Sequence, residues 1–329
     1  MVESGGEAVG GGFVVWFHNM GAMADSHVGG APYAPSAHEA HASASVPDGC
    51  AAKGGFLGRS RRLTRRSWAL LIVVFLTVLV LVAPSPYVLE TPGPTQDVLG
   101  SSGSKPVIHV TGGRSYQATG GGKLLLTTVN ASGIPGSPAS GLETLVAWLD
   151  PHATVLPQEV VFPPGQSRQD YVRSNRKDMT GSQDAAGNQA LAFLRSRGAD
   201  VSGVRLAMHV EDIGGPSAGL MYTLGAIDKL TPQDETGGQV IAGTGTMDKH
   251  GKVGRIGGIN LKMLGAQRDG ARWFLVPAGN CAEAVGHVPD GLRDVRVSTL
   301  SEAYDALTVI GQGRAGSLPH CSAGDSASR

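Results

Sequence analysis

An uncharged apolar run near the N-terminus constrains this chain more than any other feature of its sequence. Almost every side chain from Trp68 to Ala83 is apolar, and no charged residue occurs between Arg66 and Glu90. The run is close to the length that crosses a hydrocarbon core of about 30 Å. It is apolar all round, whereas a helix that packs on a soluble core is amphipathic. We therefore expect residues 67–84 to form a transmembrane anchor, which separates the chain into two environments.

The charges beside this run predict its orientation. A basic juxtamembrane run over residues 53–66 precedes it and contains Lys53, Arg59, Arg61, Arg62, Arg65 and Arg66. By the positive-inside rule, the N-terminus lies in the cytoplasm and the chain from Pro84 onward lies outside. A cleaved signal sequence is the alternative. The long N-terminal extension and the length of the apolar block favour an uncleaved anchor.

The other segments differ in composition. Residues 1–52 are rich in Gly, Ala, Ser and His, and they cannot bury enough apolar surface to offset their ordering entropy. We expect a disordered cytoplasmic tail there. Residues 85–104 are expected to be a Pro/Gly/Ser-rich linker, which Pro92-Gly93-Pro94-Thr95 keeps extended. The predicted folded domain covers residues 105–312, and residues 313–329 are expected to form a loose tail.

Apolar patterning within the folded domain predicts alternating strands and helices, an α/β (α+β) fold. Strands are expected at residues 107–110, 124–129, 155–162, 204–210, 240–244, 273–276 and 295–297, and helices at residues 142–149, 169–193, 281–285 and 301–310. The second helix is expected to break at Gly181 and Gly187. A hairpin should join the strand over 240–244 to residues 253–256, and Asn280 should cap the short helix that follows it.

Charge and motif content argue against several function classes. Lys and Arg number 27 and Asp and Glu number 27, so the formal net charge is zero and nothing suggests a nucleic-acid partner. The stretch from Gly120 to Lys123 lacks the following Ser or Thr that would hold magnesium, so we expect no ATPase module. Cys50, Cys281 and Cys321 have no metal-ligand spacing. We expect neither a metal site nor a cofactor.

Two of the cysteines fall on the same side of the predicted membrane. Cys281 and Cys321 would lie on the oxidising side, whereas Cys50 would not. Our hypothesis is a Cys281–Cys321 disulfide that pins the C-terminal tail to the domain. Two free thiols are the alternative.

The first candidate catalytic residue is Ser217. The stretch from Gly214 to Gly219 reads as a tight turn that becomes a helix, because glycine permits unusual backbone angles and Pro216 fits a first helical turn. Ser217 then lies among unpaired N–H groups at the positive end of a helix dipole. Such N–H groups can stabilise the oxyanion of acyl transfer. An ordinary serine at a helix start is the alternative.

The second candidate is Lys262. Ile259, Met263 and Ala266 fall on one helical face, and Lys262 lies on the same face. A lysine among apolar neighbours has a lowered pKa, and its neutral amine can take the proton from a serine hydroxyl. A lysine that extends its amine from the edge of the core to water is the alternative.

Together these stretches resemble the proteolytic domain of the Lon family. The resemblance is carried by Pro216-Ser217-Ala218-Gly219, Thr244-Gly245, Gly251-Lys252-Val253 and the Gly-Gly-x-x-x-Lys motif over residues 257–262, and it covers roughly residues 107–310. It implies that Ser217 is the nucleophile and Lys262 the general base, and that Thr244 orients the lysine amine. It also implies that Gly215, Pro216 and Ala218 support the serine and the oxyanion.

Within this family the chain is most similar to membrane-anchored Lon-like proteases of the actinobacterial type, which carry a linker like Tyr87 followed by Pro92-Gly93-Pro94-Thr95. It departs from them because only residues 198–203 separate the long helix from the strand before Ser217, which leaves no room for the usual PDZ module. ATP-driven members have an acidic residue where this chain has Gly214, and often a glutamate where it has Thr246.

Two functions follow as hypotheses. The first is an ATP-independent serine endopeptidase with a Ser217–Lys262 dyad on the extracytoplasmic side of the membrane. The second is a catalytically silent, membrane-anchored binding or scaffold protein that keeps the fold. The resemblance further implies unfolded or membrane-associated protein substrates and a homo-oligomer in the form of a hexameric ring.

Overall fold

A computed structural model describes residues 64–117, 120–163, 165–210, 215–322 and 324. The chain divides into two compact units, one of which covers residues 18–79 while the other contains residues 80–329. The predicted disordered tail, Cys50 and nearly all of the basic run lie outside the described residues, as does Gly214.

One helix matches the predicted transmembrane anchor. Helix α1, Arg65–Val82, is 18 residues long with a mean hydropathy of 2.1, and none of its side chains is buried. It is long and apolar enough to cross a membrane by length and composition. Both ends of α1 lie two residues earlier in the sequence than the ends of the predicted span over residues 67–84.

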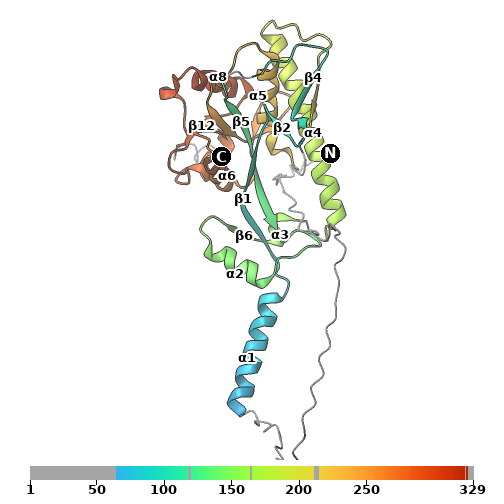
Figure 1. The fold of residues 1–329 in the computed structure, drawn as a ribbon, viewed down its shortest axis with the longest axis vertical. Helices are drawn as coiled ribbons and strands as arrows, with labels where there is room; N and C mark the ends of the chain where they lie inside the picture. Colours follow the sequence, from blue (N-terminus) through green and yellow to red (C-terminus); the bar gives the residue numbers. More distant parts are fainter. Residues whose placement is uncertain (1–63, 118–119, 164, 211–214, 323, 325–329) are drawn as a thin grey trace, which may run out of the picture. The chain divides into compact units, whose positions relative to one another are not determined.

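A curled, mixed sheet of six strands forms the centre of the folded domain (Figure 1), with the order β12-β11-β8-β5-β1-β6. The strands are β1 Tyr87–Asp97, β5 Lys123–Ser132, β6 Thr154–Pro157, β8 Val240–Gly243, β11 Trp273–Pro277 and β12 Arg293–Val297. Strands β5, β8, β11 and β12 are parallel, and β1 is antiparallel to both of its neighbours. The expected α/β class is confirmed.

Two hydrophobic clusters cover the two faces of this sheet, because alternate side chains of a strand point to opposite faces. Leu124 and Leu126 belong to the cluster that includes side chains of α4 Arg168–Ser196, α5 Gly219–Leu230 and α8 Leu300–Gly311. Leu125 belongs to the cluster formed with α6 Ile259–Arg268 and α7 Cys281–Ala284. Every residue of α5 except the last is buried, so α5 is the central helix of the domain.

More than half of the predicted linker over residues 85–104 is instead the strand β1 of the central sheet. Its prolines are tolerated because the register with β5 shifts between Pro92 and Thr95, and a bulge leaves room for residues that cannot donate a hydrogen bond. Gly93 fits there because a Cβ at this position would overlap Thr128. The folded domain therefore begins about twenty residues earlier than predicted.

Several local predictions also differ from the structure. Helix α4 runs through Gly181 and Gly187 without a break, because its packing against the core outweighs the weak helix propensity of glycine. The hairpin partner of β10 Val253–Gly254 is β9 Thr246–Met247 and not β8. The strand or extended arm predicted over residues 155–162 is wrong in its second half, because the short strand β6 is followed directly by helix α3 Gln158–Val161. Other predicted elements appear with shifted ends, namely β4 Ile108–Thr111, which pairs with β7 Arg205–Met208, and helix α2 Gly141–Leu149. Two further short strands are β2 Ser101–Ser102 and β3 Lys105–Pro106.

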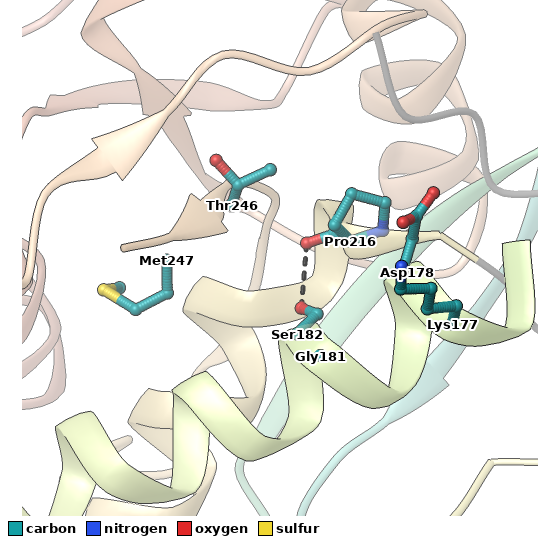
Figure 2. A pocket seen from close by; sticks show the side chains of 7 residues that line it. All are labelled: Lys177, Asp178, Gly181, Ser182, Pro216, Thr246 and Met247. Carbon is teal, nitrogen blue, oxygen red and sulfur yellow. Dashed lines mark hydrogen bonds between the residues drawn. The ribbon is translucent and has the colours of Figure 1, made fainter. Parts of the chain in front are cut away.

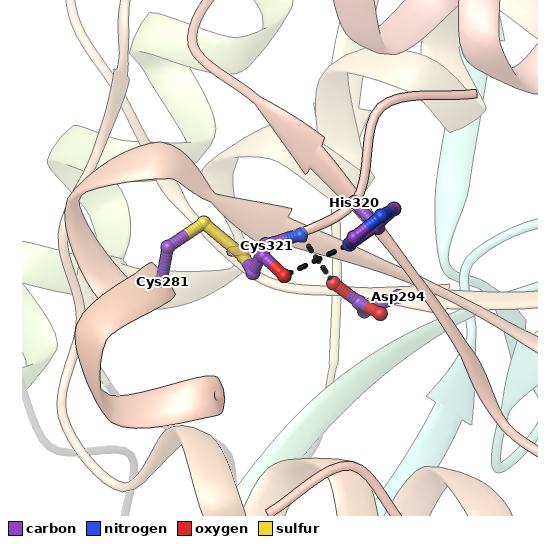
Figure 3. The surroundings of a disulfide bond; sticks show 4 residues. All are labelled: Cys281, Asp294, His320 and Cys321. Atoms are coloured by element: carbon purple, nitrogen blue, oxygen red, sulfur yellow. Dashed lines mark hydrogen bonds between the residues drawn. A yellow bond between two sulfur atoms is a disulfide. The ribbon is translucent and has the colours of Figure 1, made fainter. Parts of the chain in front are cut away.

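The C-terminal segment is attached to the domain by the hypothesised disulfide. Cys281 and Cys321 are bonded, with their Cα atoms 5.0 Å apart (Figure 3). The backbone N–H of Cys321 also donates to Asp294 Oδ2 over 2.7 Å. The chain is therefore held to the domain as far as Cys321, contrary to the loose tail that was predicted. Asn280 occupies the N-cap position of α7 as predicted, but its side chain makes no capping hydrogen bond and is instead bonded to both backbone groups of Ile256.

Candidate active site

Ser217 lies in the turn that begins the central helix. Gly215 has a φ of 92°, which favours glycine, and the single 3-10 turn Pro216–Ala218 then leads into α5. Pro216 occupies the first helical position, where its missing N–H has no cost. Ser217 is fully buried, and its Oγ has no hydrogen-bond partner among the described residues. The hydroxyl is therefore free to take part in a new interaction.

Hydrogen bonds to carbonyl groups fix this turn in place. The Ser217 carbonyl oxygen accepts from the Gly245 N–H at 2.8 Å and from Thr244 Oγ1 at 3.0 Å. Ser182 of α4 donates its hydroxyl to the Pro216 carbonyl over 2.9 Å (Figure 2). The backbone on both sides of the Ser217 amide is thus anchored by α4 and by the segment after β8.

Lys262 reaches the same place from α6. This helix starts after Gly258, whose φ of 68° is left-handed, and Lys262 is completely buried within it. Lys262 Nζ donates to Thr244 Oγ1 over 3.2 Å. One hydroxyl, that of Thr244, therefore contacts both the lysine amine and the serine backbone. The serine hydroxyl itself does not bond to the amine in this structure, because Ser217 Oγ has no hydrogen-bond partner among the described residues.

Burial changes the protonation of this lysine. Loss of solvation lowers the pKa of Lys262 from 10.5 to about 7, and the attraction of Glu90 opposes part of that decrease. A substantial share of the amine is therefore neutral near neutral pH. A neutral amine beside a hydroxyl can act as a base.

Glu90 is a site residue that the sequence analysis missed. It lies in β1 with 2% of its surface exposed, and burial raises its pKa to about 7 while Lys262 lowers it. Its Oε1 has no hydrogen-bond partner among the described residues. The sequence contained a signal, namely one acid directly after the apolar pair Val88 and Leu89, but the linker interpretation of this segment hid it.

A cavity of about 350 Å³ opens beside the serine turn (Figure 2). Its lining comes from α4, the turn before α5 and strand β9, through Lys177, Asp178, Gly181, Ser182, Pro216, Thr246 and Met247. Thr246 thus contributes to the wall of this cavity. The cavity provides space for a ligand beside Pro216, the residue before the buried Ser217.

The other expected site residues lie at the turn itself. Gly215 and Ala218 flank the Pro216-Ser217 pair, and Ala218 is buried. Pro216 carries no N–H and cannot donate to an oxyanion. Among the described residues, no group of three or more His, Cys, Asp or Glu side chains could hold a metal ion.

Comparisons with known proteins agree with this architecture. The family model of the Lon protease (S16) C-terminal proteolytic domain matches residues 137–310. The Lon protease of Brucella suis biovar 1 (strain 1330) is 30% identical over 173 residues, which cover 49% of this chain and 20% of that protein. The Lon protease of Xanthomonas oryzae pv. oryzae is 30% identical over 179 residues, which cover 50% of this chain and 20% of that protein. A mitochondrial Lon protease homolog of Emericella nidulans is 36% identical over 98 residues, which cover 28% of this chain and 8% of that protein.

The fold and these matches identify a proteolytic domain. The chain belongs to the family of the Lon protease (S16) C-terminal proteolytic domain. Its matched region covers 20% of the length of the first bacterial relatives. Ser217, Thr244 and Lys262 fall within the matched residues, whereas Glu90 precedes them.

Proposed function

We propose that this chain is an ATP-independent serine endopeptidase in which Ser217 is the nucleophile and Lys262 the general base. The observation that carries this proposal is the Thr244 hydroxyl, which accepts a hydrogen bond from Lys262 Nζ and donates one to the Ser217 carbonyl. This arrangement holds a buried amine with a pKa of about 7 beside the serine turn. A base is most effective when its pKa lies near the working pH.

The proposed reaction proceeds through an acyl-enzyme. Lys262 Nζ takes the proton of Ser217 Oγ as that oxygen attacks the substrate carbonyl carbon. Backbone N–H groups at Gly215, Ser217 and Ala218 are the candidate donors to the oxyanion. The protonated Lys262 then donates to the leaving amine, and water hydrolyses the acyl-enzyme. Lys262 Nζ must come within hydrogen-bond distance of Ser217 Oγ when substrate binds, and catalytic hydrogen bonds commonly tighten at that stage.

The cavity beside Pro216 supports a peptide substrate. Strand β9 forms one wall, and an extended chain can pair with a strand edge. An extended segment requires an unfolded or locally exposed substrate, so we propose unfolded or membrane-associated proteins. We also propose a homo-oligomeric ring, on the family resemblance alone, and light scattering of the purified chain would measure its mass.

The proposal of ATP independence rests on the Gly-rich stretch before Lys123. In a phosphate-binding loop the lysine opens a helix, whereas Lys123 here begins strand β5. A peptide bond can be hydrolysed by the serine and lysine without nucleotide. We therefore propose that the domain itself cleaves unfolded substrates in the absence of ATP.

We propose that α1 anchors the chain and that the protease domain lies on the extracytoplasmic side. The basic residues before α1 favour this orientation. The Cys281–Cys321 disulfide supports it independently, because such bonds persist in oxidising compartments. A protease added to intact spheroplasts should digest the domain if it is extracytoplasmic. If the domain is cytoplasmic, only lysed cells should show digestion.

The alternative is a catalytically silent scaffold, and the unbonded Ser217 hydroxyl favours it. The two functions differ in cleavage of unfolded casein by the detergent-solubilised full chain without ATP. We expect cleavage that Ser217→Ala abolishes and that the matched control Ser317→Ala, at an exposed serine, retains. No cleavage by the native chain would favour the scaffold.

A further inference from the structure

Helix α2, Gly141–Leu149, has its apolar side chains on the outside. The exposed fractions are 50% for Leu142, 50% for Leu145, 58% for Val146, 68% for Trp148 and 78% for Leu149. Only Ala147 is buried, whereas a helix on a soluble protein normally turns its large apolar residues inward. Contiguous exposed apolar surface of this kind marks an interaction site.

The helix is held firmly in this reversed orientation. Ser140 and Glu143 form a capping box at its start, and Ala147 packs in the small cluster with Leu89 and Ala139. Glu143 is the one charged residue of the helix, and its carboxylate is hydrogen-bonded to Ser140. The outward side chains of Leu142, Leu145, Val146, Trp148 and Leu149, which we call the α2 apolar face, therefore carry no charge.

The start of α2 is attached to the chain that directly follows α1. The Gly141 N–H donates to the Ala83 carbonyl over 3.0 Å, and the Ser85 N–H donates to the Ala139 carbonyl over 2.7 Å. Ala83 is the first residue after α1. If α1 crosses a membrane, Ala83 and Ser85 lie at the membrane surface, and the first turn of α2 lies there with them.

We infer that the α2 apolar face lies in the lipid interface of the membrane that α1 crosses. This inference rests on the anchoring role proposed above for α1. An in-plane helix buries its apolar face at the boundary of headgroups and acyl chains, and tryptophan is favoured at that depth. Trp148 supplies such a ring. Helix α2 has no basic residue, so apolar insertion rather than attraction to anionic headgroups drives the contact.

The same end of the domain supplies further apolar surface. Strand β6 contacts both α2 and α3 at the end of the domain where β1 begins (Figure 1). Val160 of α3 is 74% exposed. A second copy of this chain is the competing occupant, but the hydrogen bonds to Ala83 and Ser85 favour the lipid surface. The contact would fix the orientation of the protease domain on the membrane.

The test uses the full chain with Cys50→Ser in phosphatidylcholine vesicles. A spin label is attached at Leu149→Cys in the α2 apolar face, at Val74→Cys within α1, or at Lys249→Cys, which is exposed in the turn between β9 and β10. Collision with dissolved oxygen reports lipid, and collision with a water-soluble nickel complex reports water. We expect the labels at positions 149 and 74 to be lipid-exposed and the label at position 249 to be water-exposed. Adding Trp148→Glu should shift position 149 toward water and leave position 74 unchanged.

Three results would overturn the inference, each in a distinct way. A water-exposed label at position 149 with a lipid-exposed label at position 74 would refute the α2 contact and leave the anchor in place. A water-exposed label at position 74 would refute the anchor and the inference together. Spin–spin broadening at position 149 that disappears on dilution with unlabelled chain would assign the α2 apolar face to a second copy.

Discussion

Lys262 Nζ lies 3.2 Å from Thr244 Oγ1, and the same hydroxyl is 3.0 Å from the Ser217 carbonyl oxygen. The hydroxyl hydrogen is directed to the carbonyl, so the oxygen lone pairs face the amine. The threonine thus holds the amine and the serine turn in one arrangement.

Replacing this hydroxyl should reduce activity without unfolding the chain. Thr244→Val keeps the side-chain shape but removes two hydrogen bonds, each worth about 0.5–1.5 kcal/mol between neutral groups, so we expect kcat/KM to fall roughly 10- to 100-fold. Casein cleavage measures the change. Thr231→Val is the matched control, because Thr231 bonds only to carbonyl groups at the end of α5. Equal activity in both variants would show that Thr244 does not position the lysine.

Glu90 should set the pH at which Lys262 becomes a base. Its carboxylate raises the pKa of Lys262, so Glu90→Gln removes an attraction that favours the charged amine. The pKa of Lys262 then falls, and the acid limb of the kcat/KM profile should move to lower pH. Glu159→Gln, at an exposed position in α3, serves as the control. A limb that stays in place or moves to higher pH would contradict this coupling.

The contrast between Lys262 and Glu90 indicates what the sequence could predict. The serine, threonine and lysine occur in short motifs, and each motif begins a helix or follows a strand. Local chemistry singled out the serine and the lysine as candidates, whereas the threonine and the roles of all three came from the resemblance to the Lon family. Glu90 acts through a pairing of β1 with β5 that joins distant segments. Pro92 and Pro94 favoured a linker there. A proline cannot donate a hydrogen bond to the neighbouring strand, so an inner strand tolerates it only at a bulge.

A similar limit applies to the helices. The length of α4 was underestimated because glycine propensity is local, whereas the packing of Ala186 and Ala190 into the core is not. The strand order and the antiparallel placement of β1 also depend on contacts that no single segment encodes. The strands and helices of the parallel part were easier to predict, because they alternate along the chain.

The buried pair should give stability a minimum near neutral pH. Between the folded pKa of Lys262, about 7, and its ordinary 10.5, the unfolded chain binds more protons, so the free energy of unfolding rises with pH. Between the ordinary 4.5 of Glu90 and its folded pKa of about 7, the folded chain binds more protons, so the free energy of unfolding falls as pH rises.

Removing both charges should therefore stabilise the chain. We expect the double variant Glu90→Gln/Lys262→Met to unfold with a free energy roughly 1–4 kcal/mol higher near neutral pH, while losing activity. Urea unfolding followed by tryptophan fluorescence measures this at several pH values. A double variant less stable than the native chain would mean that the pair contributes net stability.

The disulfide should stabilise the domain by holding its C-terminal segment. Cys281 and Cys321 are 40 residues apart, and a bridge over such a loop typically adds about 2–4 kcal/mol. We expect the double variant Cys281→Ser/Cys321→Ser to have a lower melting temperature than the native chain. Reductant should lower the melting temperature of the native chain and leave that of the double variant unchanged. Cys50→Ser should have no effect. Alkylation of Cys281 and Cys321 without prior reduction would contradict the bond.

The most direct test of the central claim is the rate at which a fluorophosphonate labels Ser217 as a function of pH. A neutral Lys262 that activates the serine predicts labelling that rises with a midpoint near pH 7, the folded pKa of about 7. It also predicts almost no labelling in Lys262→Ala, with full labelling in the surface control Lys249→Ala. Labelling of Ser217 at an unchanged rate in Lys262→Ala, or none in the native chain at any pH, would contradict the account.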